Sequence, residues 1–538
     1  MRIRIVFALL AFGLQGPAAA LSVVGSPHDL SAGSGTTQIC IFCHTPHKPK
    51  ANVPLWNHFV TTQTFTFYSS NYLNTWLGFT QPTMADLPGT LTELCLSCHD
   101  GMTALGNVYN LGGETISKPQ TIAGVANLGT NLADDHPVLY DVKPGAGPPG
   151  SPGTDSEIQL PPGGDAVKVY GATNRVECTS CHNAHNNQFG SFLVKSNANA
   201  AICTTCHIKS GYSASVHATS IVSTGTTTVG ELSCRNCHRP HGASAAQAYN
   251  LRGAEEAACY QCHGNPPLTG AKNIQSLLAK TYKHPTETVS AKHKDPEQDG
   301  TNFTYSPTNN RHAECQDCHN PHQTKSGNRL SKTVPDNLIS NVLLGQWGVE
   351  PAYGATAWVP PASYTRQVFA NTTGYKEYQL CLKCHSSYAF STTPPVGITD
   401  QSIEFNPNNA TRHPVLGAGT NAYCTPTATN GSVITMELPW NQSANEHDTM
   451  MCSDCHGSDT GTDPEGPHGA NANRILQASL VAITYASYGS RYGTPLCLKC
   501  HKASVYMGTP TGSRMGEHGA GQTTHSRGPT ETGSGGYG

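Results

Sequence analysis

Charged residues are scarce in this chain, since Asp, Glu, Lys and Arg make up 12% of its 538 residues, about half the usual share. Aromatic residues contribute only 7%, whereas 54 glycines and 37 prolines are present. A chain with few strong helix formers and many turn formers is not expected to build long helices or large sheets. We therefore predict mostly irregular coil with short helices and a few short strands, and the core must have another source.

Long hydrophobic runs are also missing. The only candidate is the N-terminus, where Arg2 and Arg4 precede an apolar run over 5–14 and three alanines at 18–20. This order is typical of a secretory signal peptide, which we predict over residues 1–20. The run is too short to span a bilayer, and no cysteine stands at the cleavage point for a lipid anchor. We expect a mature chain without a transmembrane segment, located outside the cytoplasm.

Cysteine, in contrast, is abundant and strictly patterned. Of 21 cysteines, 20 form ten Cys-x-x-Cys pairs, and a histidine follows each pair directly. This is the attachment motif of c-type haem, in which both cysteines bind the porphyrin through thioethers and the histidine binds the iron. A disulfide framework would not require the histidines, and zinc ribbons would not place one after every second cysteine. The sequence therefore predicts a multihaem cytochrome c with ten haem c groups, whose haem stack forms the core.

The candidate haem-attaching cysteines are Cys40, Cys43, Cys95, Cys98, Cys178, Cys181, Cys203, Cys206, Cys234, Cys237, Cys259, Cys262, Cys315, Cys318, Cys381, Cys384, Cys452, Cys455, Cys497 and Cys500. The candidate proximal iron ligands are His44, His99, His182, His207, His238, His263, His319, His385, His456 and His501. The remaining cysteine, Cys424, is interpreted as either a buried thiol or an intermolecular bond.

The ten motifs fall into five pairs, which we take as the organising repeat. The second and third pairs have the same offset between their first cysteines, as expected from duplication of one unit. The predicted divisions are residues 21–135, 136–212, 213–275, 276–410 and 411–538, the last including the C-terminal tail. Between the first two motifs, TTQTFTFYSS at 61–70 alternates like a hairpin strand.

A second set of histidines matches the haem count. One group lies shortly after the first motif of each pair, and the other precedes each pair. The distal ligand candidates are His28, His47, His136, His185, His217, His241, His284, His322, His413 and His468. Six-coordinate iron with two histidines leaves no open position for substrate. His185 is too close along the chain to bind the opposite face of its own haem, but it could reach a neighbouring haem.

Six further histidines keep alternatives open: His58, His293, His312, His447, His518 and His525. His447 competes with His413, and His518 or His525 could replace any member of the distal set. Methionine is the other common sixth ligand. The eight methionines show no periodic relation to the motifs, so we do not assign them to iron.

The formal charge of −3 omits two propionates for each haem, so the loaded protein should be clearly acidic. An acidic surface argues against nucleic acid as a partner.

The repeated segments CTSCHNAH…ICTTCH, CRNCHRPH and CQDCHNPH resemble the doubled CXXCH multihaem cytochromes of metal-reducing bacteria. The first block, SPHDLS…CIFCHTPH…PLWNH…LCLSCHDG followed by DDHPV, is similar to a common first module of that group. The resemblance covers the haem-binding parts of all five pairs and is weak for the insertions. It implies an electron carrier for extracellular acceptors such as metal oxides, an electrode or other multihaem cytochromes.

The resemblance also implies self-association. OmcS-like members form extracellular filaments in which a histidine near the N-terminus ligates a haem of the next subunit, a role that His28 could take. Two alternatives remain, a periplasmic or porin-associated carrier and a multihaem oxidoreductase of the nitrite, hydroxylamine or tetrathionate type. Such an enzyme needs one open haem, often marked by an altered motif, and none of the ten motifs departs from histidine. The chain is therefore expected not to be an enzyme.

Overall fold

The computed structural model describes residues 22–50, 55–70, 73–74, 77–145, 157–243, 248–286, 313–327, 336–390, 393–394, 399–418, 437, 440, 449–480 and 496–501. Within it the chain forms two compact units. Unit 1 comprises Met1–Ile208 with Arg239–Ala246, and unit 2 comprises Lys209–His238 with Gln247–Gly538. The predicted signal peptide, Cys424, His293, His312, His447, His518 and His525 lie outside the described residues.

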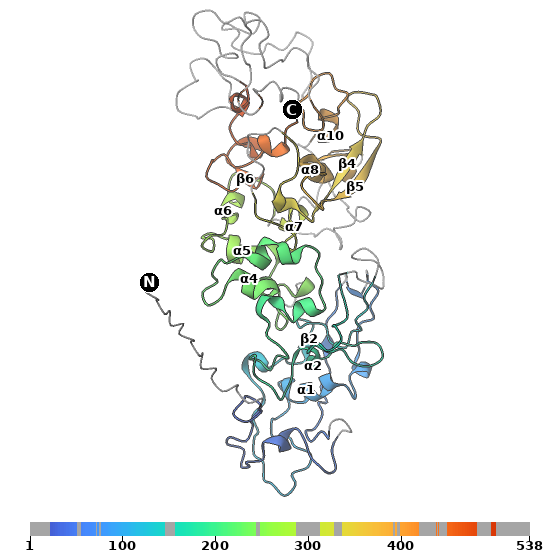
Figure 1. The fold of residues 1–538 in the computed structure, drawn as a ribbon, viewed down its shortest axis with the longest axis vertical. Coiled ribbons are helices and arrows are strands. Elements are labelled where there is room, and N and C mark those ends of the chain that lie inside the picture. Colours follow the sequence, from blue (N-terminus) through green and yellow to red (C-terminus); the bar gives the residue numbers. More distant parts are fainter. Residues whose placement is uncertain are drawn as a thin grey trace, which may run out of the picture. The chain divides into compact units, whose positions relative to one another are not determined.

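Three nine-residue helices are the longest in the described chain, and each ends on the histidine of a motif (Figure 1). They are α1 (Leu91–His99), α5 (Glu255–His263) and α8 (Glu377–His385). Helix α1 begins because the Thr90 side chain accepts a hydrogen bond from the backbone N–H of Glu93, and Glu93 itself favours the positive helix start. All three carry the second motif of a pair.

The other motifs form shorter helical turns. These are η1 (Ile39–Phe42), α2 (Cys178–Cys181), η6 (Cys203–Thr205), η8 (Ser233–Asn236), α7 (Cys315–Cys318), η11 (Cys452–Asp454) and η13 (Leu496–Lys499). Short helices away from the motifs are η3 (Met84–Asp86), η4 (Gly124–Ala126), η5 (Ala198–Ala200), η7 (Tyr212–Ala214), α3 (Val216–Thr219), α4 (Val229–Leu232), η9 (Ala248–Asn250), α6 (Gln275–Leu278), η10 (Asn341–Leu343), α9 (Ser387–Phe390), α10 (Gln401–Glu404) and η12 (Asn473–Ile475).

The strands pair only two by two. In unit 1, β1 (Thr66–Phe67) pairs in parallel with β2 (Asn131–Leu132), so the hairpin expected from 61–70 is wrong. The alternation has another cause, since Phe65 and Phe67 are both buried in a protein core. In unit 2, β3 (Tyr282–Lys283) pairs with β6 (Gly469–Ala470), and β4 (Trp347–Ala352) forms an antiparallel hairpin with β5 (Ser363–Val368).

The apolar cores are small and lie against the motif helices. In unit 1 one cluster consists of Phe65, Phe67, Leu87, Leu96, Leu132 and Leu139. In unit 2 the insertion of the fourth pair supplies a second cluster, Trp347, Val349, Tyr378, Leu382, Val415 and Met450, where β4 packs on α8. The coil-rich fold with short helices at the motifs is the one predicted for a multihaem cytochrome c. No helix among the described residues is long and apolar enough to cross a bilayer.

Candidate haem sites

Each motif forms one helical turn that brings its two cysteines and its histidine together. In the short turns the backbone N–H of the motif histidine donates to the carbonyl of the first cysteine, as at His44 to Cys40 (2.8 Å) and His182 to Cys178 (3.0 Å). None of the twenty motif cysteines forms a disulfide. The sulfurs therefore remain available for the two thioether bonds that attach a c-type haem.

In the first four pairs, the histidine of the first motif faces a histidine from the following pair. The ring centres are 6.0 Å apart for His44 and His185, 6.0 Å for His182 and His241, 6.2 Å for His238 and His322, and 6.1 Å for His319 and His468. Three of these pairs have ring planes close to parallel, at 20°, 10° and 17°, and the His182–His241 pair is tilted at 40°. The histidine that follows the first motif of a pair thus faces the pair before it.

The motif histidines of the second motif face the histidines that precede each pair. The ring centres are 6.3 Å apart for His28 and His99, 6.2 Å for His136 and His207, 6.5 Å for His217 and His263, and 6.3 Å for His284 and His385. Here the ring planes are steeply crossed, at 73°, 76°, 76° and 65°. His28 therefore lies opposite a histidine of its own chain rather than standing free for a neighbouring subunit.

These ring separations fit a haem iron between the two rings. A metal–imidazole bond is about 2 Å long and the ring centre lies about 1 Å beyond the bonded nitrogen, so opposite ligands have ring centres about 6 Å apart. Eight described pairs match this distance within a few tenths of an ångström.

Most of these rings are also oriented by their other nitrogen. Nδ1–H donates to a backbone carbonyl at His99 (Ala126, 2.7 Å), His182 (Ser191, 2.8 Å) and His456 (Arg474, 2.9 Å). The same bond occurs at His28, His136, His217, His238, His263, His284 and His319. Such a bond fixes the tautomer and leaves Nε2 to bind a metal, as metal-ligating histidines generally do.

Burial lowers the pKa of several of these rings, including His99, His136 and His319, and so favours the neutral form that binds a metal. Burial lowers the pKa of His385 to about 4, and with nearby histidines it lowers the pKa of His468 to about 3. His241 is different. Although burial favours its neutral form, the 2.9 Å bond from Nδ1 to the Asp135 carboxylate raises the pKa of His241.

The two kinds of distal histidine are joined in a repeated contact. Nδ1–H of His28 donates to the carbonyl of Ala184, the residue before His185. In the same way His217 donates to Pro321, before His322, and His284 donates to Pro467, before His468. At His136 it is the backbone N–H, not Nδ1, that donates to the carbonyl of Pro240, the residue before His241. Each of these four histidines is thus held by the segment that supplies the next distal histidine.

The cysteines indicate the order of the haems. Within a pair the second cysteines approach each other, as at Cys43 with Cys98 and Cys181 with Cys206, where each charge raises the neighbouring thiol pKa beyond the effect of burial. Between pairs the first cysteines are in hydrogen-bond contact, as at Cys95–Cys178, Cys259–Cys315 and Cys381–Cys452. The attachment points therefore follow one another in sequence order within each unit.

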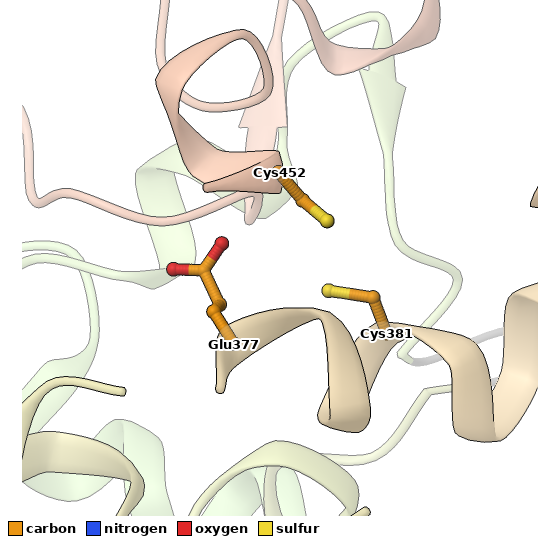
Figure 2. A group of neighbouring side chains, drawn as sticks. All are labelled: Glu377, Cys381 and Cys452. Carbon is orange, nitrogen blue, oxygen red and sulfur yellow. The ribbon is translucent and has the colours of Figure 1, made fainter. Parts of the chain in front are cut away.

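A glutamate lies at each of these three junctions between pairs, and no motif in the sequence indicates it. Figure 2 shows one of them, Glu377 on α8, beside Cys381 of the same helix and Cys452 of η11. At the preceding junction the group consists of Glu255, Glu256 and Cys315. A search restricted to histidine and cysteine patterns could not find these carboxyl groups.

Four predicted site residues fall outside the eight ring pairs. His413 and His501 are close enough to interact electrostatically, and the contact contributes to the lowered pKa of His501 after burial. The exposed ring of His47 has no partner among the described residues. The ring of His456 has no histidine ring opposite it among the described residues. Its Nδ1 donates to a backbone carbonyl, as in many of the other ligand histidines.

Comparison with known families agrees with this geometry. The family model of the doubled CXXCH motif matches residues 171–211 and 227–267, which hold the second and third motif pairs. No curated protein matches the chain. The match and the coil-rich fold support a multihaem c-type cytochrome, a class that transfers electrons and receives its haem outside the cytoplasm.

Proposed function

We propose that this chain is an electron-transfer protein that carries ten covalently bound c-type haems, each with two histidine ligands. It relays respiratory electrons outside the cytoplasm toward extracellular acceptors such as metal oxides, an electrode or other multihaem cytochromes. The observation that supports this best is the repeated facing of motif histidines and distal histidines at 6.0–6.5 Å. Bound haem supplies a one-electron couple between ferric and ferrous iron.

The residues of the chain have distinct roles in this proposal. The cysteines fix the position of each haem, and the two histidines fill both axial positions so that no substrate can bind there. Where Nδ1 bonds to a backbone carbonyl, that bond would hold the ring and increase its basicity, which favours the ferric state. The contacts between cysteines place neighbouring haems close enough for electrons to pass from one to the next.

The enzyme alternative is tested by spin state. If all haems have two histidine ligands, electron paramagnetic resonance of the full holoprotein should show low-spin ferric iron only, and nitrite or cyanide should leave the spectrum unchanged. A high-spin haem that binds these ligands and turns over nitrite, hydroxylamine or tetrathionate would favour the oxidoreductase.

We further propose that copies of the chain associate head to tail. In the four pairs of the first kind, the distal histidine comes from the next motif pair along the chain. Continuing this rule, His456 in the fifth pair requires a histidine from a following first motif. His47 is the equivalent residue of the first pair, and the rule gives it no haem within its own chain.

The loop around His47 supports this role. The backbone N–H of His47 donates to the Thr45 side chain at 3.4 Å, just as Asn183 and Asn320 receive the N–H of His185 and His322 at 3.0 Å. The His47 carbonyl is held by Asn110 Nδ2 at 2.7 Å. The backbone N–H of His47 is therefore bonded like that of its counterparts, and its side chain is exposed to solvent.

His413 supports the same arrangement independently. Three of the histidines that precede a pair donate from Nδ1 to the residue before the next distal histidine, whereas Nδ1 of His413 has no hydrogen-bond partner among the described residues. Pro46, which precedes His47, occupies the position of Pro321 and Pro467. A second copy would thus supply a carbonyl to His413 and an imidazole to the haem of His456.

The variant His47→Ala tests the association in the full holoprotein. We expect negative-stain microscopy to show polymers for the wild type and discrete particles for the variant. One haem of the variant should become high-spin, and added imidazole should restore its low-spin spectrum without restoring polymers. If the variant stays fully low-spin and still polymerises, His456 has another ligand, which His447→Ala, His518→Ala and His525→Ala would identify.

Extracellular location is tested on intact cells of the source organism. Proteinase added outside should digest the haem-staining chain if it is exposed at the surface. Protection until the outer membrane is opened would favour the periplasmic or porin-associated carrier.

A further inference from the structure

The junction between the fourth and fifth motif pairs contains a carboxylate in an unusual position. Glu377 begins α8, four residues before Cys381, and its side-chain oxygens lie with the sulfurs of Cys381 and Cys452 in a group within 4.8 Å. Figure 2 shows the carboxylate and both sulfurs turned toward a common space between the two helices. Both sulfurs belong to haem-attachment motifs, so this group is not a site for a free metal ion.

The carboxylate also joins the two haem-bearing turns. Glu377 Oε1 accepts the backbone N–H of Ser453 at 2.8 Å, and Oε2 accepts the Ser453 hydroxyl at 2.7 Å. Ser453 is the residue after Cys452, so these bonds fix one attachment turn directly to the other. Hydrogen bonds to a charged acceptor are about twice as strong as neutral ones.

A glutamate also bonds across two other junctions, those of Cys259 with Cys315 and of Cys95 with Cys178. Glu255 stands four residues before Cys259 and accepts the backbone N–H of Gln316 at 2.6 Å and its side-chain amide at 2.8 Å. At the first junction the glutamate belongs to the following pair instead of the preceding one. Glu177 accepts the backbone N–H of Thr92 at 3.0 Å. A glutamate bond across all three junctions, in segments with otherwise different sequences, argues against coincidence.

The charge at these junctions is not uniform. Burial, with the nearby carboxyl groups of Glu314 and Glu256, raises the pKa of Glu255 to about 9. Glu255 is therefore expected to carry a proton at neutral pH, and its hydrogen bonds across the junction are those of a neutral carboxyl group.

We propose that Glu377 is a positioning residue for electron transfer, which fixes the junction between two haem pairs and lowers the potential of the two haems attached there. This rests on the proposed function as a multihaem electron carrier. A negative charge beside a haem stabilises the ferric over the ferrous state, because reduction adds an electron close to that charge. When an electron passes across this junction, one iron is oxidised and the next is reduced, so a change in either potential alters the driving force.

Two variants separate charge from geometry. Glu377→Gln removes the charge but keeps both hydrogen bonds to Ser453. The amide oxygen accepts the Ser453 N–H, and the amide N–H₂ can donate to the Ser453 hydroxyl. Ser453→Ala removes one hydrogen bond and keeps the charge. Glu231→Gln is the matched control, because Glu231 lies three residues before Cys234 and bonds to Thr228 of its own helix cap.

The experiment is a spectropotentiometric titration of each full-length holoprotein, with haem content measured beside it. For Glu377→Gln we expect a shift to more positive potential in the part of the absorbance change that two of the ten haems contribute. Ser453→Ala and Glu231→Gln should titrate like the wild type, and Glu377→Asp should restore most of the wild-type curve. An unchanged curve for Glu377→Gln, or an equal shift for Ser453→Ala, overturns the inference. A wild-type protein that binds no haem would instead overturn the proposed function.

Discussion

The imidazole of His185 lies 6.0 Å from that of His44, although His185 follows the motif of Cys178 and Cys181. Its nearest motif along the chain is therefore not the one it faces. This backward reach repeats at His241, His322 and His468 and links each motif pair to the pair before it.

His185→Ala should leave all haems covalently attached and convert one of them from low-spin to high-spin. We expect the affected haem to be the one bound by Cys40 and Cys43, because His44 loses its opposite ring. Electron paramagnetic resonance measures the change, and haem staining checks the attachment. Gln188→Ala, in the same exposed loop, should leave the spectrum as in the wild type. A fully low-spin His185→Ala protein would show that another residue binds this haem.

Asp135→Asn should raise the potential of the haem between His182 and His241. The Asp135 carboxylate accepts the Nδ1 proton of His241 at 2.9 Å, which gives the ring more anionic character and favours ferric iron. Potentiometric titration should show a positive shift for one haem. Asp134→Asn is the control, since it removes a neighbouring carboxylate without removing this bond. Equal shifts for both variants would show that general charge, not the hydrogen bond, is responsible.

The ring planes predict two spectroscopic classes of haem. Near-parallel and near-perpendicular imidazoles split the iron d orbitals differently, so the ferric spectra should contain a rhombic and a strongly anisotropic low-spin signal. Among the described pairs, three are near-parallel and four near-perpendicular, and the His182–His241 pair, at 40°, lies between the two classes. Low-temperature electron paramagnetic resonance measures the ratio. A single signal type would contradict the ring orientations.

Phe369→Ala should destabilise unit 2 by about 3–5 kcal/mol, the usual loss for a fully buried phenylalanine. Phe369 is 0% exposed and packs with Ile339, Leu343, Leu344 and Leu380. The denaturant midpoint followed by tryptophan fluorescence measures the effect. The neighbouring Val368 is 49% exposed, and Val368→Ala should change the midpoint little.

The ion pairs of Lys280 with the fifth motif pair should contribute to stability in a pH-dependent way. Its ammonium group lies 2.8 Å from Asp459 and 2.8 Å from Asp463. Although burial opposes it, bonding to Lys280 lowers the pKa of both carboxyl groups. The stabilisation is therefore present above the ordinary aspartate pKa of about 3.9 and is lost as the pH falls through the lower folded value. Lys280→Met should reduce the thermal midpoint at pH 7 and leave it unchanged near pH 2, with Lys283→Met as the control.

The local chemistry of the sites could be predicted from the sequence because haem attachment uses residues within one helical turn. The turns at Cys178 and Cys315 follow directly from their motifs. The coil-rich fold was likewise predictable from glycine, proline and the low charge content. Nothing in the spacing of His185, however, indicates whether it faces the pair before or after its own.

Long-range contacts explain the rest of what the sequence did not indicate. The hairpin of β4 and β5 arises because Trp347 and Val349 are buried against α8, a tertiary effect that local propensity does not encode. Glu377 looks like an ordinary helix-start acid in the sequence. Only its bonds to Ser453 reveal a contact with the following motif pair.

The equal ring spacing of His319–His468 and His182–His241, at 6.1 Å and 6.0 Å, is kept although the connecting segments differ greatly in length. Connecting segments can therefore lengthen by insertion over evolutionary time without altering the metal geometry. Selection would act on the short turns and leave the loops free to drift. The family model of the doubled motif matches the two least extended copies, at residues 171–211 and 227–267.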